Sequence, residues 1–199
     1  QGIMGEYYYK NIDAEVSEVL RQHYLPKGRS DDLPNTVLSK IISLSDRFDN
    51  LASAFSLKLY PTGSSDPYGL RRSCIGIIRI TESLDINIDL NEILDNSFAQ
   101  VDLGVENKTD KESKQKAKSF ILDRIKNYYV ENGFSVNILN SVLKTDKEIN
   151  IKSISNKINA IKNLNKTPEL EKGVEIFKRL KNITKDNKSE IINETILAN

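Results

Sequence analysis

The sequence predicts an all-α protein. Apolar residues recur at steps of three and four along most of the chain, the spacing that places them on one face of a helix. Prolines, glycines and residues that can cap a helix stand between these apolar stripes. Residues 85–93 alternate apolar and polar side chains, a pattern that would also suit a short strand, and we favour a helix there.

Residues 1–101 contain the clearest helical stripes. A helix over 14–25 is predicted to end at Pro26 and Gly28. Asp89 is a candidate cap for a helix that runs through Ile93. The two long stripes consist of Val37, Ile41, Leu44, Phe48, Leu51 and Phe55, with Thr36 as candidate N-cap, and of Leu70, Cys74, Ile77, Thr81 and Leu84.

The chain is predicted to have two helical domains. Residues 102–116 are almost wholly polar and read as a linker between a first domain over 1–101 and a second over 117–199. In the second half, stripes predict helices over 117–132, 136–143, 151–161, 168–183 and 191–197. Thr167 followed by Pro168 is a typical helix start.

The near-neutral total charge hides two unlike halves. Residues 1–104 hold 10 Lys/Arg against 15 Asp/Glu, whereas residues 105–199 hold 19 against 13. A basic half favours a polyanionic partner, and lysines on solvated helix faces explain it equally well. No apolar run approaches the roughly 20 residues of a membrane span, so we expect no membrane partner and a cytoplasmic protein.

The sequence holds little of the chemistry that catalysis needs. Cys74 lies in an apolar run and is expected to be a buried structural thiol, while His23 is expected to be structural at a helix end. Asp46 and Asp49 stand one turn apart and could ligate a metal, but such a pair more often faces solvent or Arg47. We therefore assign no catalytic residue and no metal ligand.

The turn from Pro61 to Arg72 is the most informative motif. Asp66 can cap the following helix, and Pro67 suits its first position, which would place Arg71 and Arg72 about one turn inside. Each guanidinium can hold a phosphate through two hydrogen bonds near the helix N-terminus. An internal ion pair with Asp66 or with Asp31 and Asp32 is an equally good explanation.

Basic and aromatic residues share helices in the second half. Arg124, Lys126, Tyr128 and Tyr129 lie on one predicted helix, and Lys178, Arg179 and Lys181 lie on another. Cations beside exposed tyrosines suit RNA, because unstacked bases can stack on the rings while phosphates meet the charges. From these residues alone, tyrosines in the core and merely solubilising lysines are the better explanation.

Five motifs in order resemble one known family. They are Gly2-Ile3-Met4-Gly5 before Tyr7-Tyr8, His23-Tyr24-Leu25-Pro26, Leu44-Ser45-Asp46-Arg47-Phe48-Asp49-Asn50-Leu51, Pro61 through Arg72, and Gly76-Ile77-Ile78-Arg79-Ile80. Their order and spacing resemble the beta subunit of bacterial tetrameric glycyl-tRNA synthetase. Beyond residue 104 the resemblance is looser, and rests on residues 132–143 and 177–183, which look like the helical anticodon-binding region.

The resemblance implies an HD-like helical domain followed by part of an anticodon-binding domain. The family's enzyme attaches glycine to its tRNA with ATP and Mg²⁺, and its alpha subunit activates the amino acid while the beta subunit mainly holds tRNA. The fragment itself would need no cofactor and would be inactive alone. We expect RNA or subunit contacts from Arg71, Arg72 and Arg79, and anticodon-side contacts from Arg124, Lys126, Tyr128, Lys178 and Arg179.

This sequence also departs from the family pattern. Ser65 stands where lysine is usual, which puts a phosphate contact there in doubt, and Ser45, Tyr68 and Gly69 also differ. The chain is expected to begin inside the HD-like domain and to stop before the anticodon-binding domain is complete. Two alternative functions stay open: a metal-dependent HD-type phosphohydrolase, which needs a His-Asp cluster, and a non-catalytic helical assembly scaffold.

Overall fold

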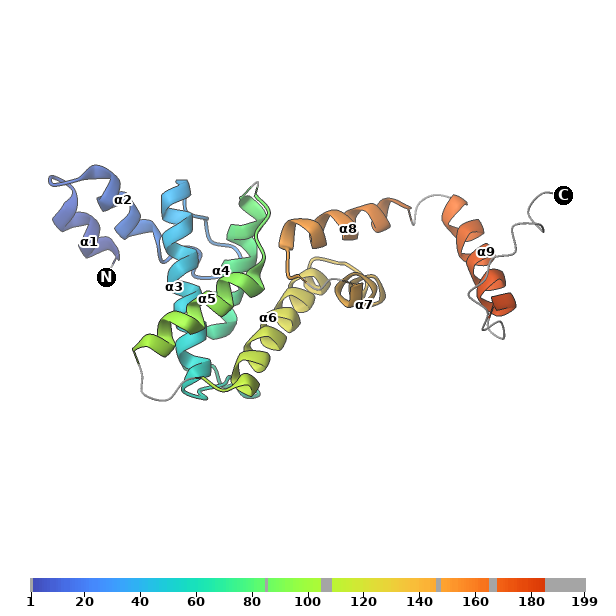
Figure 1. The fold of residues 1–199 in the computed structure, drawn as a ribbon. Coiled ribbons are helices and arrows are strands. Elements are labelled where there is room, and N and C mark those ends of the chain that lie inside the picture. Colours follow the sequence, from blue (N-terminus) through green and yellow to red (C-terminus); the bar gives the residue numbers. More distant parts are fainter. Residues whose placement is uncertain (1, 85, 105–108, 146–147, 165–167, 185–199) are drawn as a thin grey trace, which may run out of the picture. The chain divides into compact units, whose positions relative to one another are not determined.

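The computed structural model describes residues 2–84, 86–104, 109–145, 148–164 and 168–184. Within these ranges the regular secondary structure is helical, with turns and loops between the helices and an isolated bridge between Thr62 and Ser65, which confirms the all-α prediction. The helices are α1 (Gly2–Tyr9), α2 (Ala14–Gln22), α3 (Val37–Ser56), α4 (Leu70–Ser83), α5 (Leu90–Leu103), α6 (Lys111–Glu131), α7 (Val136–Thr145), α8 (Ile151–Leu164) and α9 (Pro168–Thr184) (Figure 1).

The chain divides into two compact units, residues 1–158 and 159–199. Most of the expected linker at 102–116 is helical, because α5 continues to Leu103 and α6 begins at Lys111. Its polar residues hold the two helices together: the Asp102 carboxylate accepts hydrogen bonds from the amide and hydroxyl of Thr109. The naming of the halves as HD-like and anticodon-binding-type domains stays a prediction.

Helix α3 is the centre of the first unit. It packs against α2, α4, α5 and α6, and Figure 1 shows α5 crossing it. Thr36 caps α3 as predicted, with its hydroxyl accepting a hydrogen bond from the Ser39 amide at 3.1 Å. The stripe is buried from Leu44 to Phe55, whereas Val37 and Ile41 in the first two turns are exposed.

The predicted stripes account for α4, α5 and α6, whereas α1 is not predicted and α2 ends at Gln22, before the predicted residue 25. All five stripe residues of α4 are buried. Helix α5 begins at Leu90 with Asp89 as its N-cap, which confirms a helix there, although it starts later than residue 85. Helix α6 starts six residues before the predicted Ala117, because Asp110 caps it, and it ends at Asn132 as predicted, with Gly133 at φ +85°.

The last part of the first unit is pinned to α5. The Leu90 amide donates to the Ile149 carbonyl at 2.9 Å, and the Ile149 amide donates to Asp89 at 3.1 Å. Three isoleucines at the start of α8 are buried as the stripe predicted: Ile151, Ile154 and Ile158. Among the described residues, no helix is long and apolar enough to cross a membrane.

The second unit contains α9. Its stripe has the predicted spacing, but the described apolar side chains Phe177, Leu180 and Ile183 are 67, 54 and 72 % exposed. The expected cap Thr167 and the helix over 191–197 lie outside the described residues.

Candidate nucleic-acid interface

The turn before α4 is built around Asp66. Its two carboxylate oxygens accept hydrogen bonds from the amides of Leu70 at 2.8 Å and Arg71 at 2.9 Å, so it satisfies the first amides of the helix, although the N-cap residue is Gly69 and not Asp66. The helix, however, begins at Leu70 and not at Pro67, because Gly69 adopts the left-handed conformation with φ +66°. Arg71 therefore lies in the first turn, not one turn inside.

The paired arginines have different surroundings. The Arg71 guanidinium donates to the carbonyls of Gly63 at 2.6 Å and Ser65 at 3.4 Å, so it fixes the turn through neutral groups. The Arg72 side chain is exposed and folds back over Gly69, where a Cβ would lie 2.8 Å from its Nη2. The internal ion pair considered for these residues is thus replaced, at Arg71, by carbonyl contacts.

Arg79 links α4 to the segment that follows α2. Its Nη1 donates to the Gly28 carbonyl at 2.9 Å, and the side chain is half-buried. This contact ties two segments 51 residues apart. Arg79 therefore positions the loop after α2, in addition to any contact it makes with a partner.

Arg47 is a buried arginine. The sequence patterns indicate only that it could pair with Asp46 or Asp49. It is 7 % exposed, and its Nη2 donates to the carbonyls of Tyr24 at 3.2 Å and Pro26 at 2.8 Å. It lies against α4 at Gly76, where a Cβ would come within 2.3 Å of its Nε. The sequence signal for this site is Gly76, a residue without a side chain inside the apolar run 74–78.

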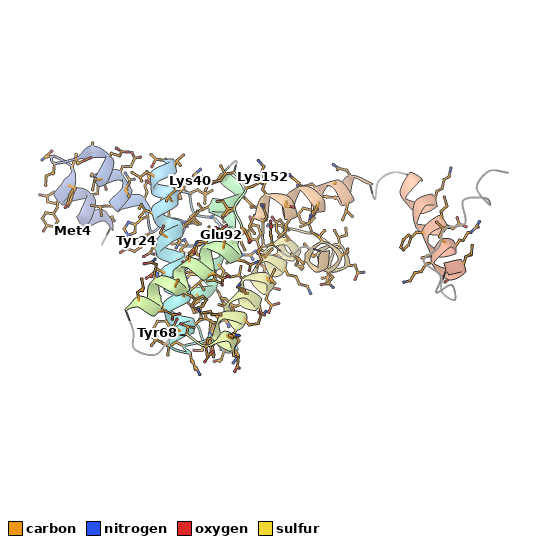
Figure 2. The ribbon with its side chains drawn as sticks, in the orientation of Figure 1. Met4, Tyr24, Lys40, Tyr68, Glu92 and Lys152 are labelled. Atoms are coloured by element: carbon orange, nitrogen blue, oxygen red, sulfur yellow. The ribbon has the colours of Figure 1, made fainter. Side chains whose placement is uncertain are left out.

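Arg47 and Arg72 meet at a cavity of about 500 Å³. Its walls come from α1, from α2 and the segment after it, from α3, and from the turn that starts α4: Gly2, Ile3, Arg21, Tyr24, Pro26, Lys27, Asp46, Arg47, Asn50, Tyr68, Gly69, Arg72 and Ser73. Tyr24 follows α2 and Tyr68 precedes α4, and both are labelled in Figure 2. Four cationic side chains and one carboxylate line this space, which gives it a positive charge.

The two tyrosines of α6 face α4. Tyr128 and Tyr129 both donate their hydroxyls to Glu82 of α4, at 2.9 and 2.6 Å, and Tyr129 is buried. Burial, and then the Glu82 carboxylate, raise the pKa of both tyrosines. Tyr129 is therefore a core residue, as the more conservative explanation held, and Tyr128 offers only part of its ring.

The two predicted cationic residues of α6, Arg124 and Lys126, are half-buried. The Arg124 guanidinium lies 5.7 Å from the Phe120 ring centroid, and its Nε has no hydrogen-bond partner among the described residues. Lys126 follows it on the same helix. The Tyr128 ring also lies 5.8 Å from the guanidinium carbon of Arg29, which itself pairs with Glu131.

The predicted residues of α9 are exposed. Arg179 pairs with Glu175 one turn earlier at 2.5 Å, with both side chains largely in solvent. Lys178 beside it is also exposed. These two residues lie in the second unit, whereas the arginines of α4 lie in the first.

The candidate ligands and nucleophiles take structural positions. Among the described residues, no group of three or more His, Cys, Asp or Glu side chains could hold a metal ion. Asp46 accepts a long hydrogen bond from Asn50, and Asp49 is exposed. His23 caps α2 with its Nδ1 at 2.9 Å from the Leu20 carbonyl, and Cys74 is buried, which raises the pKa of its thiol, so both are structural as predicted.

The fold and the site define an all-α protein with a cationic cavity at the start of α4. The family described as the glycyl-tRNA synthetase beta subunit matches residues 1–144. The chain therefore belongs to this family, a component of a tRNA ligase.

Relatives in three bacteria support this membership. Proteins named glycine–tRNA ligase beta subunit share 32 % identity in Sulfurihydrogenibium sp., 33 % in Rickettsia canadensis and 34 % in Buchnera aphidicola. The matches cover 92, 94 and 98 % of this chain but only 24, 27 and 28 % of the relatives. The chain thus spans about a quarter of the length of the curated relatives that it matches.

Proposed function

We propose that this chain is a tRNA-holding part of glycine–tRNA ligase. Its relatives are named as the beta subunit of that ligase, and the match extends over nearly the whole chain. The observation that carries the proposal is the pair of arginines at the start of α4. Arg71 is held in place by backbone carbonyls, so Arg72 is presented at a fixed helix N-terminus, a favourable position for a phosphate.

The remaining reaction belongs to other parts of the enzyme in this proposal. An alpha subunit would activate glycine with ATP and Mg²⁺, and the complex would work in the cytoplasm. The described carboxylates of this chain form no cluster that fits a metal ion, so we place no step of the chemistry on them. The chain alone would bind tRNA and form no bond.

Two surfaces would contact tRNA. Arg71, Arg72 and Arg79 of α4 would meet the sugar–phosphate backbone or the partner subunit. Arg124, Lys126, Lys178 and Arg179 would serve the anticodon side, and Tyr128 would contribute the part of its ring that Glu82 and Arg29 leave open. Phosphate contacts supply affinity, whereas base contacts supply preference for one tRNA.

A binding titration tests this function. The 199-residue chain is titrated with glycine-specific tRNA and with an unrelated tRNA at two salt concentrations. We expect affinity to fall steeply as salt rises, because phosphate contacts release counterions, and glycine-specific tRNA to bind better. Reversing both charges with Arg71→Glu and Arg72→Glu is expected to weaken binding of both tRNAs.

The control variant reverses two positive charges at other places on the surface of the chain. Lys10→Glu with Lys111→Glu alters two exposed lysines outside the α4 turn and the cavity. If this variant loses as much tRNA affinity as the α4 variant, the loss reflects the net charge of the chain, and the assignment of tRNA binding to Arg71 and Arg72 is wrong. Absence of tRNA binding at low salt, with circular dichroism showing a folded chain, would contradict the proposed function itself.

A further inference from the structure

The cavity beside α4 carries an excess of positive charge. Arg21, Lys27, Arg47 and Arg72 line it together with one carboxylate, Asp46. Arg21 also has Glu6 as an ion-pair partner at 3.4 Å. Even with that pair counted, the walls keep more cations than anions, which favours an anionic ligand.

The buried member of this set, Arg47, has no printed hydrogen bond or ion pair to a carboxylate, although Asp46 lies next to it on α3. Arg47 is 7 % exposed, and the hydrogen bonds it makes go to two carbonyls, which carry no net charge. Its Nε also has no partner among the described residues, but that atom lies against Gly76 of α4, which does not line the cavity. Burial lowers the pKa of Arg47, while the neighbouring Asp46 opposes that shift. A buried guanidinium is costly unless an anion lies near it, so an anion entering the cavity would gain from this charge.

Two cations at the wall of the cavity are free to close on such an anion. Within the described part of the chain, neither the Arg72 guanidinium nor the Lys27 ammonium takes part in an ion pair. Arg72 curls over Gly69, where the absence of a Cβ lets its Nη2 approach the backbone at the helix start. Its planar fork can therefore receive a phosphate beside the N-terminus of α4.

The rest of the wall suits the remainder of a nucleotide. Asp46 and Asn50 stand one turn apart on α3 and offer oxygens and an amide to hydroxyl or amino groups. Tyr68 is 58 % exposed and adds an aromatic ring on which a base can stack, whereas the Tyr24 ring already lies 3.9 Å from the His23 ring, centroid to centroid (Figure 2). The volume falls within the ordinary range for small-molecule sites, about 300–1,000 Å³.

We propose that this cavity binds a nucleotide that carries a terminal phosphate, with Arg72, Lys27 and Arg47 around the phosphate. A terminal phosphate carries close to two negative charges, and a phosphodiester carries one, so the excess of cations favours the terminal group. Two sources share this chemistry: a free mononucleotide and the 5′-phosphorylated end of an RNA. The second source deepens the proposed tRNA-holding function and rests on it, whereas the first is independent of it.

Calorimetric titration of the 199-residue chain separates these sources. The ligands are AMP, adenosine, a short RNA oligonucleotide with a 5′-phosphate, and the same oligonucleotide with a 5′-hydroxyl. We expect AMP to bind at least about tenfold more tightly than adenosine, because charge-assisted hydrogen bonds go to its phosphate. If RNA ends are the source, the 5′-phosphorylated oligonucleotide also outcompetes its 5′-hydroxyl form.

A pair of variants locates the site. Arg72→Gln should weaken AMP binding about tenfold, since it removes a charged donor from the wall without touching the core. Lys40→Gln is the control, because Lys40 lies on the same α3 helix as Arg47 but does not line the cavity (Figure 2). It should leave AMP affinity unchanged.

The outcomes decide between the two proposals. Equal affinity for AMP and adenosine, or equal loss in the two variants, would overturn the cavity inference. Salt-dependent tRNA binding without AMP binding would overturn it too and leave the proposed function standing. AMP binding without tRNA binding would support the cavity as a free-nucleotide site and contradict the tRNA-holding function.

Discussion

The cation-bearing regions of α4 and α9 look alike in sequence and differ in structure. Both combine an apolar stripe with arginine on an amphipathic helix. In α4 the stripe is buried, so the helix is held in place. Backbone carbonyls fix the side chains of Arg71 and Arg79. In α9 Phe177, Leu180 and Ile183 are exposed, and Arg179 pairs with Glu175 on its own helix. An apolar stripe therefore fixes the direction of the cationic side chains on its helix only where another helix or loop packs against that stripe.

The largest expected effect tests the two stripes directly. Phe48→Ala in α3 should lower the free energy of unfolding by about 3–5 kcal/mol, because Phe48 is 1 % exposed and its removal leaves a cavity. Phe177→Ala in α9 is the matched control and should change it by less than about 0.5 kcal/mol. Denaturant unfolding followed by circular dichroism measures the free energy of unfolding of both variants. Equal decreases would contradict the difference in burial between the two stripes.

A smaller effect concerns the two tyrosines of α6, of which only Tyr128 is a predicted RNA contact. Tyr129→Phe should lower the free energy of unfolding by about 1 kcal/mol, because it removes a hydrogen bond to the Glu82 carboxylate. Tyr128→Phe should cost less, since that side chain is more exposed. A tRNA affinity that falls with Tyr129→Phe in a fully folded chain would show that Tyr129 reaches the ligand after all.

The hydrogen bond between Tyr129 and Glu82 predicts that the free energy of unfolding depends on pH in the alkaline range. The pKa of Tyr129 is raised by burial and then by Glu82, so the folded chain holds this proton more tightly than the unfolded chain. Its contribution to stability is complete below the ordinary tyrosine pKa of about 10 and is lost as pH rises beyond it. Urea unfolding between about pH 9 and 11 should therefore show a shallower decline for Tyr129→Phe, and identical slopes would contradict the assignment.

The smallest effect belongs to the α9 ion pair. Glu175→Gln should change the free energy of unfolding by no more than about 0.5 kcal/mol, because an exposed pair one turn apart contributes little. The same variant frees Arg179 and lowers the local negative charge, so tRNA affinity should rise slightly if α9 contributes to binding. A large loss of stability would mean that α9 depends on this pair.

The helices themselves could be predicted well from the sequence. The existence of α2 to α9, the Thr36 and Asp89 caps and the end of α6 at Asn132 follow from local spacing and capping chemistry, whereas α1 (Gly2–Tyr9) is not predicted. The start of α4 was predicted three residues early, because the left-handed conformation of Gly69 separates Asp66 from the first turn. The start of α6 was predicted six residues late, since polarity was taken as a sign of a linker.

The candidate site could be predicted only in part. Arg72 was chosen from its place after a helix start, and it does line the cavity. Arg21 and Lys27 were missed, because they come from α2 and the segment after it, 40 or more residues earlier in the chain. Arg47 was missed as a cavity residue because its burial depends on Gly76 of a neighbouring helix.

The sequence by itself determined the helices from α2 onward, the role of Asp66 in the turn before α4, and the family that the chain resembles, because these depend on residues near one another along the chain. Tertiary structure alone decided which stripes are covered, which tyrosines turn inward to Glu82, and which cations meet around one cavity. The physical reason is that burial and charge compensation depend on contacts between distant segments, and periodicity within one helix carries no information about its neighbour.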